Sequence, residues 1–261
     1  MNINLKGKNA LVGGSSKGIG RAIAEQLAAS GANVTVMARS EMVLNEVVNQ
    51  LTTNSGQKHQ YLVVDFSNFT DFTVKIKEYF KNNSVDILIN NTQGPSAGGA
   101  LEKSIDDYQA AFDLLFKCAV LTTNLALSHM QKKKWGRIIN VASISVREPL
   151  NYLSLSNSLR AALVTWAKSV SLDIAVDNIT INNTLTGYFD TERIAQLNAQ
   201  KAKKIGIPVS EVRAALEDSV PAKRIGRPEE YANLVCFLAS EQASYITGTN
   251  IPIDGGLLKS F

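Results

Sequence analysis

A glycine-rich run near the amino terminus, GGSSKGIG, has the residue types and spacing of a phosphate-binding turn. It follows the apolar run Asn9–Val12 and opens a helical pattern near Arg21. Glycines at such places permit a tight turn, close approach of the backbone to a pyrophosphate, and close packing of helix on strand. The helix start adds free N–H groups and the positive end of its dipole. The sequence therefore predicts a dinucleotide site, a βα turn without ligand being the alternative. The residues expected to contact the cofactor here are Gly14, Ser16, Lys17, Gly18, Ile19 and Gly20.

The second apolar run ends in Met37-Ala38-Arg39, which bears on the choice of cofactor. A dinucleotide without a 2′-phosphate favours a carboxylate at this place, to accept a hydrogen bond from the ribose hydroxyl. An arginine suits a 2′-phosphate, and Lys17 supplies a second cation. Both side chains are otherwise ordinary surface charges. The sequence favours NADP(H) over NAD(H).

Short apolar runs alternate with longer amphipathic stretches along the chain. The expected strands are Asn9–Val12, Asn33–Met37, Tyr61–Val64, Val85–Ile89, Arg137–Val141, Thr180–Asn182 and Asn250–Ile253. The expected helices include Gly20–Ser30, Tyr108–Met130, Arg160–Ala175 and Glu229–Ser240. This order predicts an α/β fold, a doubly wound parallel seven-stranded Rossmann sheet with helices on both faces. We expect one domain over residues 1–261. The polar segment Asp190–Arg224 reads as a helical insertion, either a lid or a plain surface helix pair.

Composition excludes several other classes of protein. Apolar residues make up 45% of the 261 residues and the net charge is +4, too weak to argue for nucleic acid. We expect the cationic cluster Lys132-Lys133-Lys134 with Arg137 to be a solvated helix end. Two cysteines and two histidines offer no metal-binding spacing, and the cysteines fit buried free thiols in a reducing compartment. With no signal-peptide pattern and no uncharged apolar run of membrane length, we expect a cytoplasmic protein without a membrane span.

Taken in order, the motifs resemble the short-chain dehydrogenase/reductase family over essentially the whole chain. They are GGSSKGIG, Asp65 closing the third strand, ILINN, INVAS, ITINNTLTG, GRPEE and YITGTNIPIDGG. The resemblance implies that Asp65, followed by Phe66, meets the adenine and that Asn91 lines the cofactor cleft. It also implies that Gly187 and Thr191 lie near the nicotinamide, Thr191 beside its carboxamide.

The catalytic positions depart from that family. The family has a serine, a tyrosine thirteen residues later and a lysine four beyond it; counting from Ser143 reaches Ser156 and Arg160. An asparagine usual in the preceding long helix falls on Leu115. The family's Pro-Gly after the sixth strand reads Thr186-Gly187. The runs NNTQGP, SVREP and LSLSNSLR are similar to a divergent branch labelled 3-oxoacyl-carrier-protein reductase-like.

These substitutions change the chemistry that the site can perform. Carbonyl reduction needs a hydride at carbon and a proton at oxygen, and the family's tyrosine gives that proton. Ser156 is a poor acid, and its side chain is shorter than the family's tyrosine by the whole ring. Arg160 can hold the ribose hydroxyls as the lysine would, or stabilise an oxyanion, but it stays charged and shuttles no proton. Tyr188 and Tyr152 are candidates for the acid that replaces the family's tyrosine, although either could instead be a packing residue. Water is a third candidate source of the proton.

Three functions remain open on the sequence. The first is an NADP(H)-dependent oxidoreductase of the short-chain type, reducing a carbonyl (3-oxoacyl or ketone) with an atypical catalytic set of Ser143, Ser156, Arg160 and Tyr188. The second is a non-catalytic NADP(H)-binding sensor or partner protein. The third is an enzyme of another class that keeps the cofactor bound, such as a dehydratase or epimerase. The resemblance also implies a homo-oligomer, a tetramer or dimer, formed through helices Tyr108–Met130 and Ser156–Ala175.

Overall fold

The computed structural model describes residues 3–260, and within that range it contains one parallel sheet in the order β3-β2-β1-β4-β5-β6-β7. The strand order reverses between β1 and β4, and such a reversal leaves a ligand-binding crevice at the carboxyl ends of the strands. The predicted doubly wound seven-stranded fold is confirmed. The strands are β1 (Asn9–Gly13), β2 (Asn33–Ala38), β3 (Gln60–Val63), β4 (Ile87–Asn90), β5 (Gly136–Val141), β6 (Ile179–Thr186) and β7 (Asn250–Ile253).

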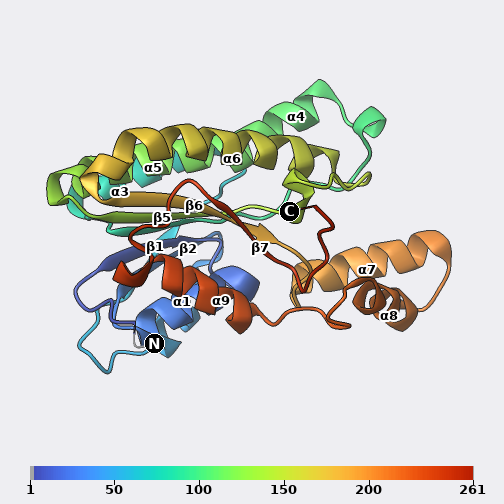
Figure 1. Cartoon of the computed structure of the whole chain (residues 1–261), viewed down its shortest axis with the longest axis horizontal. Coiled ribbons are helices and arrows are strands. Elements are labelled where there is room, and N and C mark those ends of the chain that lie inside the picture. The colour runs from blue at the N-terminus through green and yellow to red at the C-terminus, as the bar shows by residue number, and fades with distance from the viewer. Residues whose placement is uncertain (1–2, 261) are drawn as a thin grey trace.

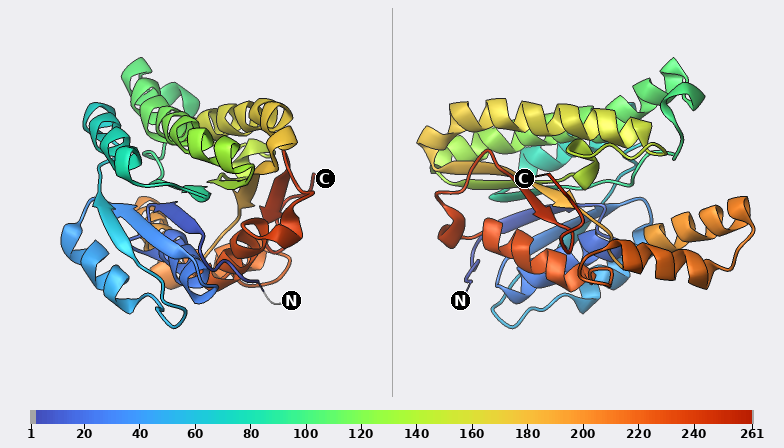
Figure 2. Two further views of the ribbon diagram at one scale, coloured as in Figure 1. Left: turned by 90° about the vertical axis from the view of Figure 1, so that its left-hand side faces the viewer. Right: turned by 45° about the vertical axis from the view of Figure 1, so that its right-hand side comes forward.

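Helices cover both faces of the sheet, as Figures 1 and 2 show. One face carries α1 (Gly18–Ala29), α2 (Glu41–Gln50) and α9 (Pro228–Leu238). The other carries α3 (Phe69–Asn82), α4 (Ile105–Phe112), α5 (Cys118–Lys133) and α6 (Ser154–Ile174). Central strands of such a sheet are buried on both sides, which is why their sequences are nearly continuous apolar runs.

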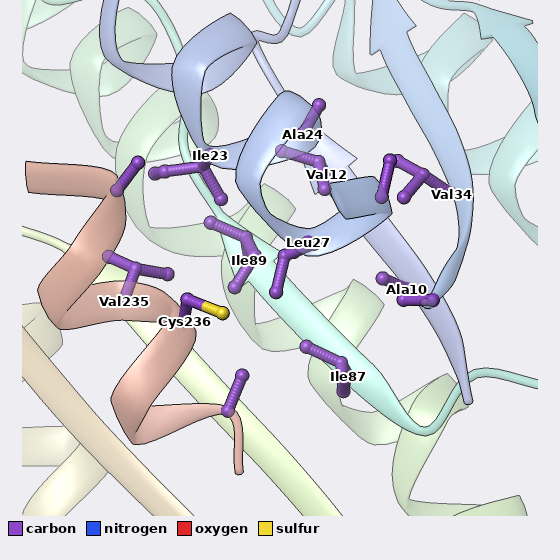
Figure 3. Packing of buried hydrophobic residues seen from close by; sticks show 14 of the residues in the cluster. Ala10, Val12, Ile23, Ala24, Leu27, Val34, Ile87, Ile89, Val235 and Cys236 are labelled. Carbon is purple, nitrogen blue, oxygen red and sulfur yellow. The ribbon is translucent and has the colours of Figure 1, made fainter. Parts of the chain in front are cut away.

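The core between the sheet and α1 and α9 is built from small and branched side chains. Leu27 of α1 and Val235 of α9 pack over Ile87 and Ile89 of β4, and Cys236 joins them (Figure 3). Cys236 and Cys118 are both buried free thiols, as expected.

Among the strands, the longest departure from the predicted bounds is β6, which runs to Thr186 instead of ending at Asn182. Its polar residues are buried, and amides on adjacent strands satisfy one another there. Asn90 donates to Asn140, Asn140 to Asn183, and Asn183 to Asn250, each at 2.8 Å. These four residues are register partners on β4, β5, β6 and β7, so one amide ladder crosses four strands.

The helices also differ from their expected bounds. α6 begins at Ser154, earlier than the predicted Arg160, so Ser156 and Arg160 lie one turn apart on the same helix face. The predicted helix Tyr108–Met130 is interrupted by a π-helical turn, Asp113–Lys117, which contains Leu115.

The segment from Ile105 to Lys133 is, among the residues described, long and apolar enough to cross a membrane by length and composition. Its longest stretch without a charged residue is Cys118–Gln131, shorter than a membrane span, so the expectation that no uncharged apolar run has membrane length stands. The segment packs on the sheet, with Cys118, Ala126 and Met130 in the core, as in the central helix of many soluble proteins.

The insertion at 190–224 contains α7 (Glu192–Ile205) and α8 (Val209–Ser219) and no strand. In Figure 1 this helical hairpin extends beyond the end of the sheet.

The three lysines of the cationic cluster are exposed at the carboxyl end of α5, as expected, but Arg137 does not belong to that solvated helix end. Arg137 is fully buried and donates to the carbonyls of Ser240 and Asn178. Lys133 pairs with the buried Asp86 at 2.6 Å. These cations therefore hold the amino-terminal edge of the sheet together.

Candidate active site

The glycine turn has the backbone that a phosphate cradle needs. Gly14 and Gly18 have φ values of +56° and +57°, which favour glycine. A Cβ at Gly20 would lie 2.2 Å from the Gly14 carbonyl oxygen, and one at Gly13 would lie 2.3 Å from that of Asn91. Lys17 precedes α1 without a side-chain cap, so the first N–H groups of α1 remain free for an anion. The residues present therefore fit a dinucleotide pyrophosphate.

The predicted residues around the turn have distinct positions. The Asn91 side-chain amide donates to the Gly13 carbonyl at 3.0 Å, so this residue braces the turn from the exit of β4. Ile19 is partly buried against the core beneath α1. Ser16 is half-buried within the turn.

Beyond β2, charged side chains occupy the edge expected to meet the adenosine. Asp65 accepts hydrogen bonds from the Ser67 hydroxyl at 2.6 Å and the Ser67 N–H at 2.9 Å. These bonds, and the more distant charge of Arg39, lower the pKa of Asp65. Arg39 is exposed, while Phe66 is buried against Phe72 with ring centroids 5.2 Å apart.

Lys17, the expected second cation for a 2′-phosphate, is ion-paired with Glu192 at the start of α7. Next to it, the Arg193 guanidinium donates to the carbonyl of Pro95, in the loop after β4, at 3.0 Å. A Cβ at Gly18 would lie 3.2 Å from the Thr191 side chain. The start of α7 thus contacts the glycine turn on one side of the crevice and the loop after β4 on the other. Glu192 and Arg193 were not predicted, because their partners are distant in sequence.

The altered catalytic residues, Ser156 and Arg160, lie on α6, next to the carboxyl end of β5. Arg160 donates to the Val141 carbonyl and, at 3.2 Å, to the Ser156 hydroxyl. It lines one cavity together with Gly13 and Asn91. Burial lowers the pKa of Arg160, and none of the ion pairs within residues 3–260 includes it. The structure therefore holds an arginine without a carboxylate beside the predicted cofactor turn.

Ser143 follows β5 and is half-buried. Its hydroxyl oxygen accepts the Ser145 N–H at 3.1 Å, so the hydroxyl hydrogen is still available to a ligand. Ser156, by contrast, is buried and accepts from Arg160, which makes it a support for the guanidinium.

The two candidate tyrosines meet, although 36 positions separate Tyr152 from Tyr188 in the sequence. Burial raises the pKa of Tyr188, and the charge and hydrogen bond of Tyr152 raise it further. Tyr188 is half-buried on the loop after β6, and Tyr152 is exposed just before α6. Tyr188 is therefore a neutral phenol with a hydrogen to donate, but a weaker acid than a free tyrosine.

The sheet, its strand reversal and the glycine turn define a dinucleotide-binding α/β protein. Within the part of the chain described, no group of three or more His, Cys, Asp or Glu side chains suits a metal ion. Residues 14–258 match the family profile described as enoyl-(acyl carrier protein) reductase. The chain belongs to the short-chain dehydrogenase/reductase family, whose members are nicotinamide-dependent oxidoreductases.

Relatives agree with that assignment over full length. The 3-oxoacyl-[acyl-carrier-protein] reductase FabG of Aquifex aeolicus is 31% identical over 263 residues, covering 98% of this chain and all of the relative. The NADPH-dependent reductase BacG of Bacillus subtilis is 31% identical, covering 97% and 98%. The structure of L-sorbose reductase from Gluconobacter frateurii, complexed with NADPH and L-sorbose, has a TM-score of 0.93 at 30% identity, with full coverage of both chains.

Proposed function

We propose that this oxidoreductase uses NADP(H) to reduce a carbonyl, of a ketone or a 3-oxoacyl thioester, with Ser143, Arg160 and Tyr188 as the reacting set. The observation that carries the proposal is the position of Arg160, a half-buried cation in the same cavity as Gly13 and Asn91. A cation in that place is what both the ribose hydroxyls and a developing oxyanion require. The names of the relatives, reductases of 3-oxoacyl thioesters and of a ketose, support the substrate class.

The glycine turn and the free N–H groups of α1 would hold the pyrophosphate, Arg39 the 2′-phosphate and Arg160 the nicotinamide ribose. NADPH supplies the hydride when bound. Ser143 donates its hydroxyl hydrogen to the substrate carbonyl oxygen, and Arg160 stabilises the charge that develops there. Tyr188 gives the proton to that oxygen, and Tyr152 keeps its phenol in place. Ser156 orients Arg160.

A second function, non-catalytic binding of NADP(H), is favoured by one feature of the same site. No phenol stands at Ser156, and the pKa of Tyr188 is raised, which makes proton donation harder. This function keeps the cofactor contacts and assigns no proton transfer to Tyr188.

Replacing Ser143 separates these functions. Ser143→Ala should lower NADPH-dependent turnover by two to three powers of ten, as the loss of an oxyanion donor does. The assay follows NADPH oxidation with ketones, 3-oxoacyl thioesters and ketoses. Ser145→Ala, a buried serine two residues on whose hydroxyl has no partner among the residues described, is the matched control and should leave turnover within about threefold.

The double variant Ser156→Tyr with Arg160→Lys rebuilds the family pair. A large gain in turnover from an inactive wild type would contradict the reductase proposal and support a binding protein. A loss of activity would support the serine–arginine arrangement as the working site.

A further inference from the structure

Arg193, at the start of α7, carries a positive charge that no carboxylate neutralises. Its guanidinium donates to the Pro95 carbonyl at 3.0 Å, and none of the ion pairs within residues 3–260 includes it. The side chain is exposed. Because a planar guanidinium has five N–H donors, most of them remain free in this contact. Arg193 is therefore a cation with donors available to a ligand, and the mechanism above does not use it.

The acidic residues on either side of Arg193 in the sequence are held by other cations. Asp190 accepts two hydrogen bonds from the Arg213 guanidinium, each at 3.1 Å, and Glu192 is ion-paired with Lys17. Adjacent residues on a helix also do not face each other, so Glu192 points away from Arg193. The positive charge of Arg193 is thus uncompensated.

Arg193 differs from the other arginines of the described chain that have no carboxylate partner. Arg39 and Arg160 are already assigned to the cofactor and to the reacting carbonyl. Arg147 donates to the carbonyl of Asn250 at 3.3 Å, on the edge strand β7. Arg193 alone of these borders the crevice without an assigned ligand.

The loop after β4 connects Arg193 to the cavity that holds Arg160. Thr92 lines that cavity, and Pro95, three residues later, binds Arg193. A Cβ at Gly94 would lie 3.7 Å from Nη2 of Arg193. Three residues span at most about 11 Å even when fully extended. The two guanidiniums therefore border neighbouring parts of one crevice.

We propose that Arg193 binds an anionic oxygen group of the substrate, a carboxylate or a phosphate, and so selects carbonyl compounds that carry a negative charge. The inference deepens the proposed reductase function and rests on it. A guanidinium fork gives either anion two parallel charge-assisted hydrogen bonds, which are about twice as strong as the bonds that a neutral ester would accept. Since only one donor is used on Pro95, the anion can bind without breaking that contact.

The anion can have two sources, and matched pairs of substrates distinguish them. Acetoacetate and ethyl acetoacetate have the same reacting ketone, but only the acid has a carboxylate. Acetoacetyl-CoA and the acetoacetyl thioester of N-acetylcysteamine have the same thioester, but only the first has phosphates. Within each pair, the ratio of kcat/KM for the charged member to that for the neutral member measures what the anion contributes.

Arg193→Gln keeps a donor for the Pro95 carbonyl but removes the charge. The ratio of at least one pair should fall about fivefold to tenfold in this variant, near the lower end of the range for a hydrogen bond to a charged group, because Arg193 is exposed. Arg193→Lys keeps the charge without the fork and should retain part of the preference. A merely structural role, in which Arg193 only ties α7 to the loop, would lower kcat/KM for both members equally and leave the ratio unchanged.

Arg147→Gln is the matched control, because it makes the same change at another exposed arginine that has no carboxylate partner and donates to a carbonyl. It should keep the wild-type ratios. NADPH affinity, measured by fluorescence titration, should be the same in Arg193→Gln as in the wild type, since the cofactor phosphates have the glycine turn and Arg39.

Calorimetry on the complex with NADP⁺ repeats the comparison without turnover, because NADP⁺ has no hydride to give to a ketone. The same pairs are titrated into wild type and Arg193→Gln, and the ratio of affinities is compared. Ratios that are equal in the two proteins for both pairs would overturn the inference, as would a loss of NADPH affinity with unchanged ratios. A ratio that falls in Arg193→Gln, found in a protein that reduces no carbonyl, would support the anion site while refuting the proposed reductase. Binding of no member of either pair would refute both.

Discussion

Arg160 is the side chain that most changes the chemistry of this site relative to that of the family. A planar guanidinium keeps its charge and offers five donors, so it can bind the Val141 carbonyl and Ser156 and still face a ligand. A lysine at this position would carry the same charge but would lack the fixed arrangement of donors that a planar guanidinium provides. The exchange therefore preserves anchoring and removes proton exchange from this position.

Arg160→Ala should weaken NADP(H) binding by about 1.5–3 kcal/mol, the usual range for a hydrogen bond to a charged group. Fluorescence titration measures the effect directly. Arg160→Lys is the control and should recover most of the loss. Unchanged affinity in the alanine variant, with a native circular dichroism spectrum, would show that the arginine faces away from the ligand.

Tyr188 can be tested through the pH dependence of turnover. Because burial raises its pKa above the ordinary value of 10.0, the phenol stays protonated throughout the neutral range. If it is the acid, carbonyl reduction should show no basic limb until the pH passes that raised pKa, where the proton is lost and the rate falls.

Tyr188→Phe should depress turnover by about a hundredfold, the usual contribution of a positioned acid, and leave NADPH affinity unchanged. Tyr152→Phe should have a smaller effect, since it only supports Tyr188. Full activity in Tyr188→Phe would assign the proton to water.

At the scale of elements, the amide ladder explains how polar strands lie in a buried sheet. Each asparagine has an in-register partner, so Asn140 and Asn183 are almost wholly buried yet satisfied. A shift of one residue in any strand would break the ladder, which ties the exits of β5 and β6 to one alignment. The residues that follow those exits, Ser143 and Tyr188, depend on that alignment.

Asn140→Leu should lower the free energy of unfolding by about 2–4 kcal/mol. It leaves the buried Asn183 amide oxygen without its donor and removes one of the two acceptors of the Asn90 amide, which keeps Thr123; an orphaned buried group costs about 1–3 kcal/mol. Urea denaturation measures the change. Asn124→Leu, on the exposed side of α5, should cost less than about 0.5 kcal/mol. Equal stability of the two variants would show that the ladder contributes little.

At the scale of the whole molecule, one sheet joins the two helical layers, and the crevice lies where the strand order reverses. A cofactor bound there contacts the ends of several strands and the start of α7. Its binding energy should therefore stabilise the chain as one unit. A ligand at a hundred times its dissociation constant adds about 2.7 kcal/mol.

Thermal unfolding should consequently show a single transition that NADPH raises by several degrees and NADH, at equal concentration, by less. Arg39→Ala should bring the two shifts together, because the 2′-phosphate loses its cation. Arg227→Ala, another exposed arginine, should preserve the difference. Equal shifts in the wild type would contradict the assignment of NADP(H) to Arg39.

The sequence alone determined the features that depend on neighbours along the chain. Periodicity and the glycine spacing predicted the sheet and its turn, and counting from Ser143 reached Ser156 and Arg160, which the structure places one helical turn apart. Whether Arg39 and Arg160 hold the cofactor stays a prediction until the titrations above are done.

The tertiary structure decided what depends on partners far apart in sequence. It extended β6 from the predicted end at Asn182 to Thr186, because partners on neighbouring segments satisfy the buried amides of Asn182 and Asn183. It brought Tyr152 to Tyr188 and Tyr231 to Thr186, and it paired Lys17 with Glu192. A side chain's type states what it can donate or accept, but only the packed chain supplies the partner.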